Sequence, residues 1–578
     1  MRKILSLWNE MANIQIDMFE VQLGAALLLQ FRLADGQVIR VLADAGVDNS
    51  SGYQPDHVYK KLFLDNGDPT AVWTDFSEVP PKLDLIVGTH YDADHLRGLI
   101  PIILNTALDI DEIWLPPVQD DDGVVSTSIV SGGDSSLVKR LMADDSGEVL
   151  RHYLSRRLVR IENVDKVYDL GLENVEHHTE DSLLSRLIER TASRNRLNEE
   201  SKRNILMNTE STSKFFMKQR MAATHALGQE DDEHEYEQPG DDDQPFVDAV
   251  DRLKYMSTWI TSPFDTVGIV EHDMVSMNAL GRRWFNESVL MSDHLALETI
   301  RKSAANEAIN ATNLANIVNA IKKRHSSGGS HIRIVSEAIP QGTPRYYRWC
   351  GTGFQEANPN SPSELGFHLM GPSNELIVKL HKKLPIGTYL LAYRAEGLKS
   401  GTVTPSNRLS YVMRFHHQEQ HILVTGDAGF SDFAPARSKK FYPDLLTLLK
   451  PLHVVQVAHH GGLNHRFYEA LDAGGLPSQS DWSFLLLSHA TDDKTRPRAE
   501  FSRFVALFRH NNHDDVSVLF TSRPIKGKVN TILNLIHPVV PSHIHSADRG
   551  DVRLSFPHQA DPDRGGTRWK VEKHNISV

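Results

Sequence analysis

The chain has 578 residues, of which 40% are hydrophobic and 24% are charged, and this length predicts two or three folded units with sizeable cores. A single cysteine, Cys350, excludes an intramolecular disulfide and a metal centre built from several thiolates. No apolar run reaches the ~18–20 residues of a membrane helix, and the N-terminus lacks the core of an export signal. We therefore expect a cytoplasmic protein with no membrane partner.

The net charge of −13 has a local origin. Residues 230–243 carry nine acidic groups and no basic ones, so the rest of the chain is nearly balanced. We interpret residues 228–246 as a solvated, disordered acidic loop. The alternative is that this tract mimics nucleic acid and guards a basic groove.

The first 118 residues alternate between strand and helix patterns. A helix is predicted over residues 96–107, and residues 34–37 (Ala-Asp-Gly-Gln) predict a hairpin-like turn. Runs of apolar or alternating residues predict strands at 14–20, 26–32, 38–42, 83–87 and 112–115.

Helical periodicity replaces the strand pattern from residue 119 to residue 330. The predicted helices cover residues 137–142, 149–159, 183–197 and 295–321. This segment is too long for a loop, so we expect an inserted helical domain over 119–330.

Three arginines in the predicted insertion recur every four residues. Arg186, Arg190 and Arg194 should therefore share one face of a helix. Such a row can follow a phosphate backbone, which makes these residues candidate substrate contacts. Ordinary surface ion pairing with nearby glutamates is an equally good interpretation.

Short strand patterns return after residue 331. They cover residues 376–380, 411–415, 422–424, 454–457, 484–487 and 516–520. Together with the N-terminal strands they predict a mixed α/β fold.

The strongest chemical signal follows the apolar run at 83–87. His90, Asp92, Asp94 and His95 place two imidazoles and two carboxylates within six residues. The loop that leaves a buried strand is where α/β proteins usually present their chemistry. Imidazole and carboxylate together suit zinc or manganese, so the loop predicts a metal centre rather than a polar turn that caps the next helix.

This His-x-Asp-x-Asp-His pattern resembles the signature loop of the metallo-β-lactamase superfamily, His-x-His-x-Asp-His. The aspartate at position 92 is similar to the variant in the soluble domain of ComEC-type DNA-uptake proteins. The resemblance spans residues 14–118 and 331–555. Its other motifs follow in the family's order: Asp44, Leu-Met-Gly-Pro at 369–372, Ser-Asn-Arg-Leu-Ser at 406–410, Val-Thr-Gly-Asp at 424–427 and Val-Ala-His-His-Gly-Gly at 457–462.

The resemblance implies a four-layer αββα sandwich whose halves are residues 1–118 and 331–578, the latter with a C-terminal extension. It implies two divalent ions, one held by His90 and Asp92 and the other by Asp94 and His95. Asp44 would be structural. Further expected ligands are Asp427, which would bridge both ions, and His459, His460 and His489. Catalytic roles would then fall to Asp94, Asp427 and His460.

Some positions depart from the family pattern. The family's middle histidine has no clear counterpart, and Asn407 occupies the matching segment. Arg496 precedes Pro497 where the DNA-uptake domains have His-Pro. We expect Asn407 and Arg496 to contact substrate. Of the adjacent His459 and His460, only one would face the ions in a strand, whereas both would at a turn.

The predicted function is hydrolysis by a metal-bound hydroxide, most simply as a phosphodiesterase or nuclease acting on nucleic acid or a nucleotide. The carboxylate-rich ligand set favours hard ions, so manganese should serve at least as well as zinc. The alternatives are an ester, lactone or thioester hydrolase, and a regulatory or interaction protein with a degenerate metal site.

Overall fold

In the computed structural model, the chain forms two compact units. One comprises Met1–Ala143, Asn313–Leu380 and Val403–Val578, and the other comprises Asp144–Thr312 and His381–Thr402. The residues that the structure describes are 12–21, 24–46, 57–63, 82–118, 137–158, 287–361, 363–381, 405–430, 432–435, 440–462, 464–476, 483–489, 496–510, 516–522, 550–558 and 568–575. Most of the predicted insertion at 119–330, including its acidic loop at 228–246, lies outside them, so its boundaries stay a prediction.

The first of two eight-stranded sheets has the order β18-β17-β1-β2-β3-β5-β7-β8. Pairing is antiparallel from β18 to β3 and parallel from β3 to β8. The bounds are β1 Ile14–Met18, β2 Leu27–Arg32, β3 Val38–Ala43, β5 Leu85–Val87, β7 Glu112–Trp114, β8 Arg333–Val335, β17 Gly550–His558 and β18 Arg568–Asn575. A two-stranded sheet pairs β4 (Lys82–Leu83) with β6 (Asp109–Ile110).

The second sheet has the order β10-β9-β11-β12-β13-β14-β15-β16 and is parallel from β13 to β16. The bounds are β9 Arg345–Trp349, β10 Phe354–Glu356, β11 Leu365–Gly371, β12 Val412–His417, β13 Gln420–Val424, β14 Val454–Gln456, β15 Ser483–Leu487 and β16 Val516–Phe520. The mixed α/β fold expected from the sequence is therefore present.

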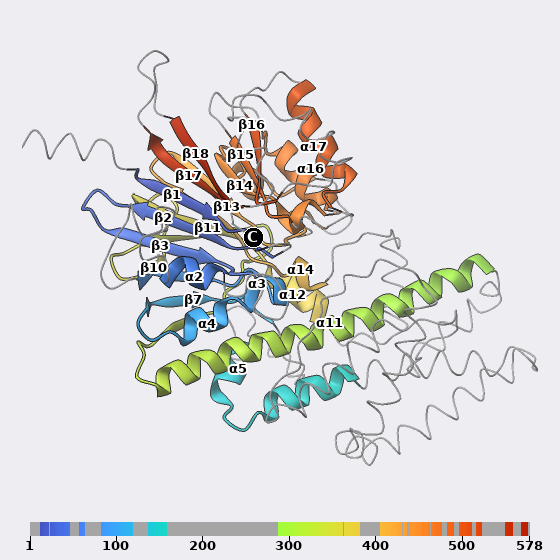
Figure 1. Ribbon diagram of the computed structural model, residues 1–578. Coiled ribbons are helices and arrows are strands. Elements are labelled where there is room, and N and C mark those ends of the chain that lie inside the picture. Colours follow the sequence, from blue (N-terminus) through green and yellow to red (C-terminus); the bar gives the residue numbers. More distant parts are fainter. Residues whose placement is uncertain are drawn as a thin grey trace, which may run out of the picture. The chain divides into compact units, whose positions relative to one another are not determined.

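The two sheets share one hydrophobic core. Phe31 of β2 stacks on Phe415 of β12 at 6.3 Å, and Trp114 of β7 meets Phe367 of β11 edge-on at 5.2 Å. Strands β3, β5 and β15 are buried along their whole length, which explains their nearly continuous apolar sequences. Figure 1 shows the blue and yellow-to-orange strands of this unit together with α16 and α17.

Helices fill the connections between strands. Their bounds are α2 His57–Phe63, α3 Ala93–Leu96, α4 Leu99–Leu104, α5 Leu137–Ala143, α11 Glu287–Ser326, α12 Asn374–His381, α14 Pro405–Arg408, α15 Pro443–Thr447, α16 His465–Ala473 and α17 Ala499–His510. Residues 148–158 are also helical. No helix in the described part of the chain is both long and apolar enough to cross a membrane.

The single helix predicted over 96–107 is instead split into α3 and α4 at Gly98. The Gly98 amide donates to the carbonyl oxygen of Gly46 at 3.0 Å rather than to its own helix. A Cβ at Gly98 would lie 2.7 Å from the carbonyl carbon of Ala45. The break therefore lets the loop at 44–46 approach the helix backbone closely.

The strand predicted at 376–380 was wrong, because these residues form most of α12. Its start is capped by Ser373, whose hydroxyl accepts a hydrogen bond from the Leu376 amide at 3.1 Å. A short apolar run has no periodicity that separates a strand from a helix, and here the cap decides.

Candidate metal centre

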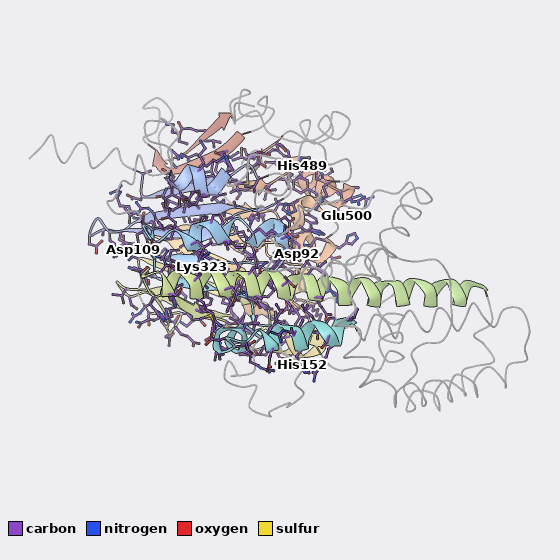
Figure 2. All side chains as sticks on the ribbon, turned by 60° about the horizontal axis from the view of Figure 1, so that its bottom comes forward. Asp92, Asp109, His152, Lys323, His489 and Glu500 are labelled. Carbon is purple, nitrogen blue, oxygen red and sulfur yellow. The ribbon has the colours of Figure 1, made fainter. Side chains whose placement is uncertain are left out.

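The metal-loop residues begin directly after β5 and continue into α3. His90 and His95 are buried at 1% and 0% exposure, and their rings lie 3.8 Å apart between centroids. Asp92 precedes α3 in an extended conformation, and its side chain is one third exposed. Figure 2 labels Asp92 at this helix start. The loop thus places two buried imidazoles toward the protein interior and the Asp92 carboxylate toward solvent.

The Asp427 carboxylate, which follows β13, lies at the centre of four imidazoles. Its Oδ1 is 3.5 Å from Nε2 of His95 and 3.7 Å from Nε2 of His460. Its Oδ2 is 3.7 Å from Nε2 of His90 and 4.0 Å from Nε2 of His459. Each carboxylate oxygen therefore faces two ring nitrogens. His90 and His95 follow β5 of the first sheet, and His459 and His460 follow β14 of the second.

Hydrogen bonds on the outer side of three rings fix which nitrogen carries the proton. Nδ1 of His95 donates to Oδ2 of Asp44 at 2.7 Å. The Thr89 hydroxyl donates to the same oxygen at 2.5 Å, so it accepts from Nδ1 of His90 at 3.2 Å. The Ser488 hydroxyl donates to the Gly24 carbonyl and accepts from Nδ1 of His460 at 3.4 Å. In the neutral form of each ring, the network thereby leaves the Nε2 lone pair on the side of Asp427.

The inward atoms have no hydrogen-bond partner. Nε2 of His90, His95 and His460 and Oδ1 of Asp427 are buried and unpaired. Buried acceptors that face one another without a donor cost free energy, and a divalent cation would satisfy them together. These residues therefore fit a metal ion.

The residues form three groups of close ligand atoms that could hold a metal ion. The groups are Asp44 with His90 and His95, Asp94 with His95 and His460, and His90 with Asp92 and Asp427. Asp44 already accepts hydrogen bonds from the Thr89 amide, the Thr89 hydroxyl and His95. Its role is therefore to orient the His95 ring rather than to bind an ion itself.

A tight turn at 458–461 presents the adjacent histidines. His459 and His460 both have left-handed backbone conformations, with φ of 54° and 50°. Such conformations cost ~1–3 kcal/mol for residues other than glycine and cluster at functional sites. Because the chain turns here, both rings reach Asp427, with His460 buried and the His459 side chain 26% exposed.

The electrostatics of the cluster follow from burial and its carboxylates. Burial lowers the pKa of His95, but the carboxylates of Asp44 and Asp427 raise it by more than burial lowers it. The net effect is a pKa raised to about 10. Burial alone would raise the pKa of Asp427, yet the surrounding imidazoles, His460 foremost, hold it well below its usual range. The centre therefore carries a negative charge that attracts either protons or a cation.

The remaining predicted site residues occupy different positions. Asn407 is buried and donates to Oδ2 of Asp427 at 3.1 Å, so it orients the central carboxylate. Burial lowers the pKa of His460, Asp427 opposes this shift, and the positive charge of Arg496 adds to the lowering. Arg186, Arg190 and Arg194 lie outside the described residues.

The structure does not bring His489, labelled in Figure 2, into any of the three ligand groups. Its Nε2 lies 2.9 Å from the carbonyl oxygen of Arg496, and its Nδ1 lies 3.5 Å from the Ser522 hydroxyl. Both ring nitrogens are thus engaged away from Asp427, and its assignment as a ligand stays a prediction.

Thr89 and Ser488 are site residues that the sequence interpretation missed. Each hydroxyl belongs to the residue directly before a candidate histidine and follows a buried strand, β5 or β15. Their position after a buried strand and before a candidate histidine was the signal in the sequence that could have identified them.

No protein-family model matches the chain, and no curated protein matches its sequence.

Proposed function

We propose that this protein is a metallo-β-lactamase-like hydrolase that cleaves phosphodiester bonds in nucleic acid or nucleotides. The observation that carries the proposal is the Asp427 carboxylate, each oxygen of which faces two imidazoles. The inward Nε2 atoms of His90, His95 and His460 are buried and have no hydrogen-bond partner. The shared core of the two sheets supports a four-layer αββα sandwich, with Asp427 between loops of both sheets.

The ligand positions favour two ions, of zinc or manganese. His90 and Asp92 would hold one ion, and Asp94, His95 and His460 the other. Asp427 would bridge them, because its two oxygens face different pairs of rings. When bound, such a pair lowers the pKa of a water molecule and neutralises charge on phosphoryl oxygens.

The protein's own residues prepare this chemistry. Asp44, Thr89 and Ser488 hold three imidazoles with their Nε2 lone pairs inward, and Asn407 holds Asp427. These contacts are made before substrate arrives, so no reorganisation is required at the moment of reaction.

The class of substrate is argued from charge. Carboxylate-rich sites prefer hard ions, which commonly organise phosphate oxygens. The positive charge of Arg496 acts on His460, and a guanidinium is a common partner of phosphate groups. A neutral ester, lactone or thioester carries no negative charge for that guanidinium to bind before the reaction begins.

The test measures metal content and hydrolysis together. Bis-para-nitrophenyl phosphate and single-stranded DNA should be cleaved, with manganese at least matching zinc. His90→Ala and Asp427→Ala should lower activity by ~100-fold or more, because metal chemistry contributes several kcal/mol. His331→Ala, which removes an exposed imidazole outside the centre, is the control for adventitious metal binding and should change neither readout.

Two results would contradict the proposal. Purified protein that binds no divalent ion would remove the metal centre. Rapid lactone or thioester turnover, without phosphodiester cleavage under any divalent metal, would keep the centre and replace the substrate class.

A further inference from the structure

A second group of histidines lies on the second sheet, away from the metal centre. His368 of β11, His416 of β12 and His421 of β13 follow one another across adjacent strands, with ring centroids 6.4 Å apart at each step. His453, which precedes β14, continues the row at 5.7 Å from His421. Tyr346 of β9 closes its other end. We call these five residues the histidine row.

Strand register places the row on the face opposite the shared core. His416 pairs with His421, and the flanking Phe367 and Phe415 point into the core. Because successive strand residues alternate between faces, His416 must face away from Phe415. His368, His416 and His421 are partly exposed, whereas His453 and Tyr346 are buried, so a solute can reach the row at its three middle residues.

Arg414 lies within this row, paired with His368 across β11 and β12. Only 6% of the residue is exposed, and its Nε is buried with no hydrogen-bond partner. Within the described chain, the Arg414 guanidinium donates one long hydrogen bond, of 3.5 Å, to the carbonyl oxygen of Pro451. Nδ1 of His368 and Nδ1 of His421 are likewise buried and unpaired.

The row contains positive charge without a compensating carboxylate among the described residues. Burial is the cause that lowers the pKa of Arg414 to about 10. Burial and then Arg414 lower the pKa of His368 to about 3 and that of His421 to about 2, and no acidic side chain opposes them. At neutral pH these imidazoles are uncharged, and each offers one N–H to a solute.

A buried guanidinium without a counter-ion costs several kcal/mol, and an anion would remove that cost. A metal cation does not fit, since the guanidinium would repel it and these rings form none of the close ligand groups in the described chain. The donor set instead matches a compact, multivalent oxyanion, which accepts hydrogen bonds from several directions.

We propose that Arg414, His368 and His421, with the neighbouring rings, form a binding site for a small phosphate-type oxyanion. The site is separate from the metal centre, and it does not depend on the proposed hydrolase activity.

Calorimetric titration with sodium phosphate, in Tris chloride at constant ionic strength, tests this directly. Wild-type protein should bind phosphate, and Arg414→Met should weaken binding ~10-fold or more through loss of charge-assisted hydrogen bonds. His421→Asn should weaken it less, which gives a second variant that keeps the guanidinium. Arg503→Gln, an exposed arginine of α17, is the matched control and should bind as wild type does.

The metal centre is itself a place where phosphate could bind, so the titration is repeated with His90→Ala. Phosphate binding that survives His90→Ala and is lost in Arg414→Met supports the site. Absence of binding in wild type, binding that persists in Arg414→Met, or binding that is lost in His90→Ala alone would each overturn it. A mononucleotide titrated in parallel shows whether a phosphate group on a larger molecule is admitted.

Discussion

Replacing Asp44 with asparagine tests how the metal centre is prepared. Asp44 is fully buried, and its Oδ2 accepts hydrogen bonds from both His95 and the Thr89 hydroxyl, while its Oδ1 accepts from the Thr89 amide at 2.7 Å. Its backbone φ of 57° is one that asparagine adopts readily, so the substitution adds no backbone strain.

The magnitude follows from the hydrogen-bond inventory. The new amide must keep its oxygen toward the Thr89 amide, which places its NH2 group against Nδ1 of His95. Nδ1 then has to accept, and the ring proton moves to Nε2, the atom that faces Asp427 at 3.5 Å. Loss of such an orienting partner typically weakens metal affinity 10–100-fold, or ~1.4–2.7 kcal/mol.

The assay is competition for zinc and manganese between the protein and a chelating dye, with the imidazole tautomer read by nitrogen-15 NMR. Asp84→Asn is the matched control, because Asp84 is a buried carboxylate that accepts from the Arg40 amide at 2.8 Å outside the centre. Its metal affinity should equal that of wild type. Unchanged affinity in Asp44→Asn, or an Nδ1–H tautomer at His95 in that variant, would refute the reasoning.

Two further predictions concern stability. Burial raises the pKa of Asp432 to about 6, even though the Ser373 amide donates a hydrogen bond to it. The folded state is therefore favoured while this carboxyl is protonated. The free energy of unfolding should fall by ~3 kcal/mol as the pH rises from about 4 through 6. Asp432→Asn should therefore gain urea resistance over wild type at pH 8 and not at pH 4, and parallel pH profiles would contradict this. Arg324 is buried and donates to the carbonyl oxygens of Ile103, Asn105 and Leu108, so Arg324→Met should cost ~3 kcal/mol or more of unfolding free energy. Lys323→Met, at the exposed neighbour labelled in Figure 2, is the control, and equal denaturation midpoints for the two variants would exclude this role.

The sequence by itself determined the features that depend on near neighbours. The strands at 14–18, 27–32 and 38–43 were predicted within two residues, because apolar composition and bounding turns act locally. The candidate ligands of the metal loop were also recognisable, since His90, Asp92, Asp94 and His95 lie within six residues.

Tertiary structure decided everything that depends on segments far apart in the chain. Gly98 divides a predicted helix because Ala45 approaches it, and β17 pairs with β1 across more than 500 residues. Local patterns cannot specify such pairings, because the free energy comes from contacts that form only on folding.

The same limit applies within the sites. The turn at 458–461 brings both His459 and His460 to Asp427, while His489 is engaged by Arg496 and Ser522. The sequence left open which of these three histidines are ligands. Strand register likewise aligned the histidine row around Arg414, although its members, from Tyr346 to His453, are spread over more than a hundred residues. Residue types determined which chemistry was available, and the pairing of distant strands decided which side chains meet, because a side chain's neighbours are set by register and burial rather than by sequence distance.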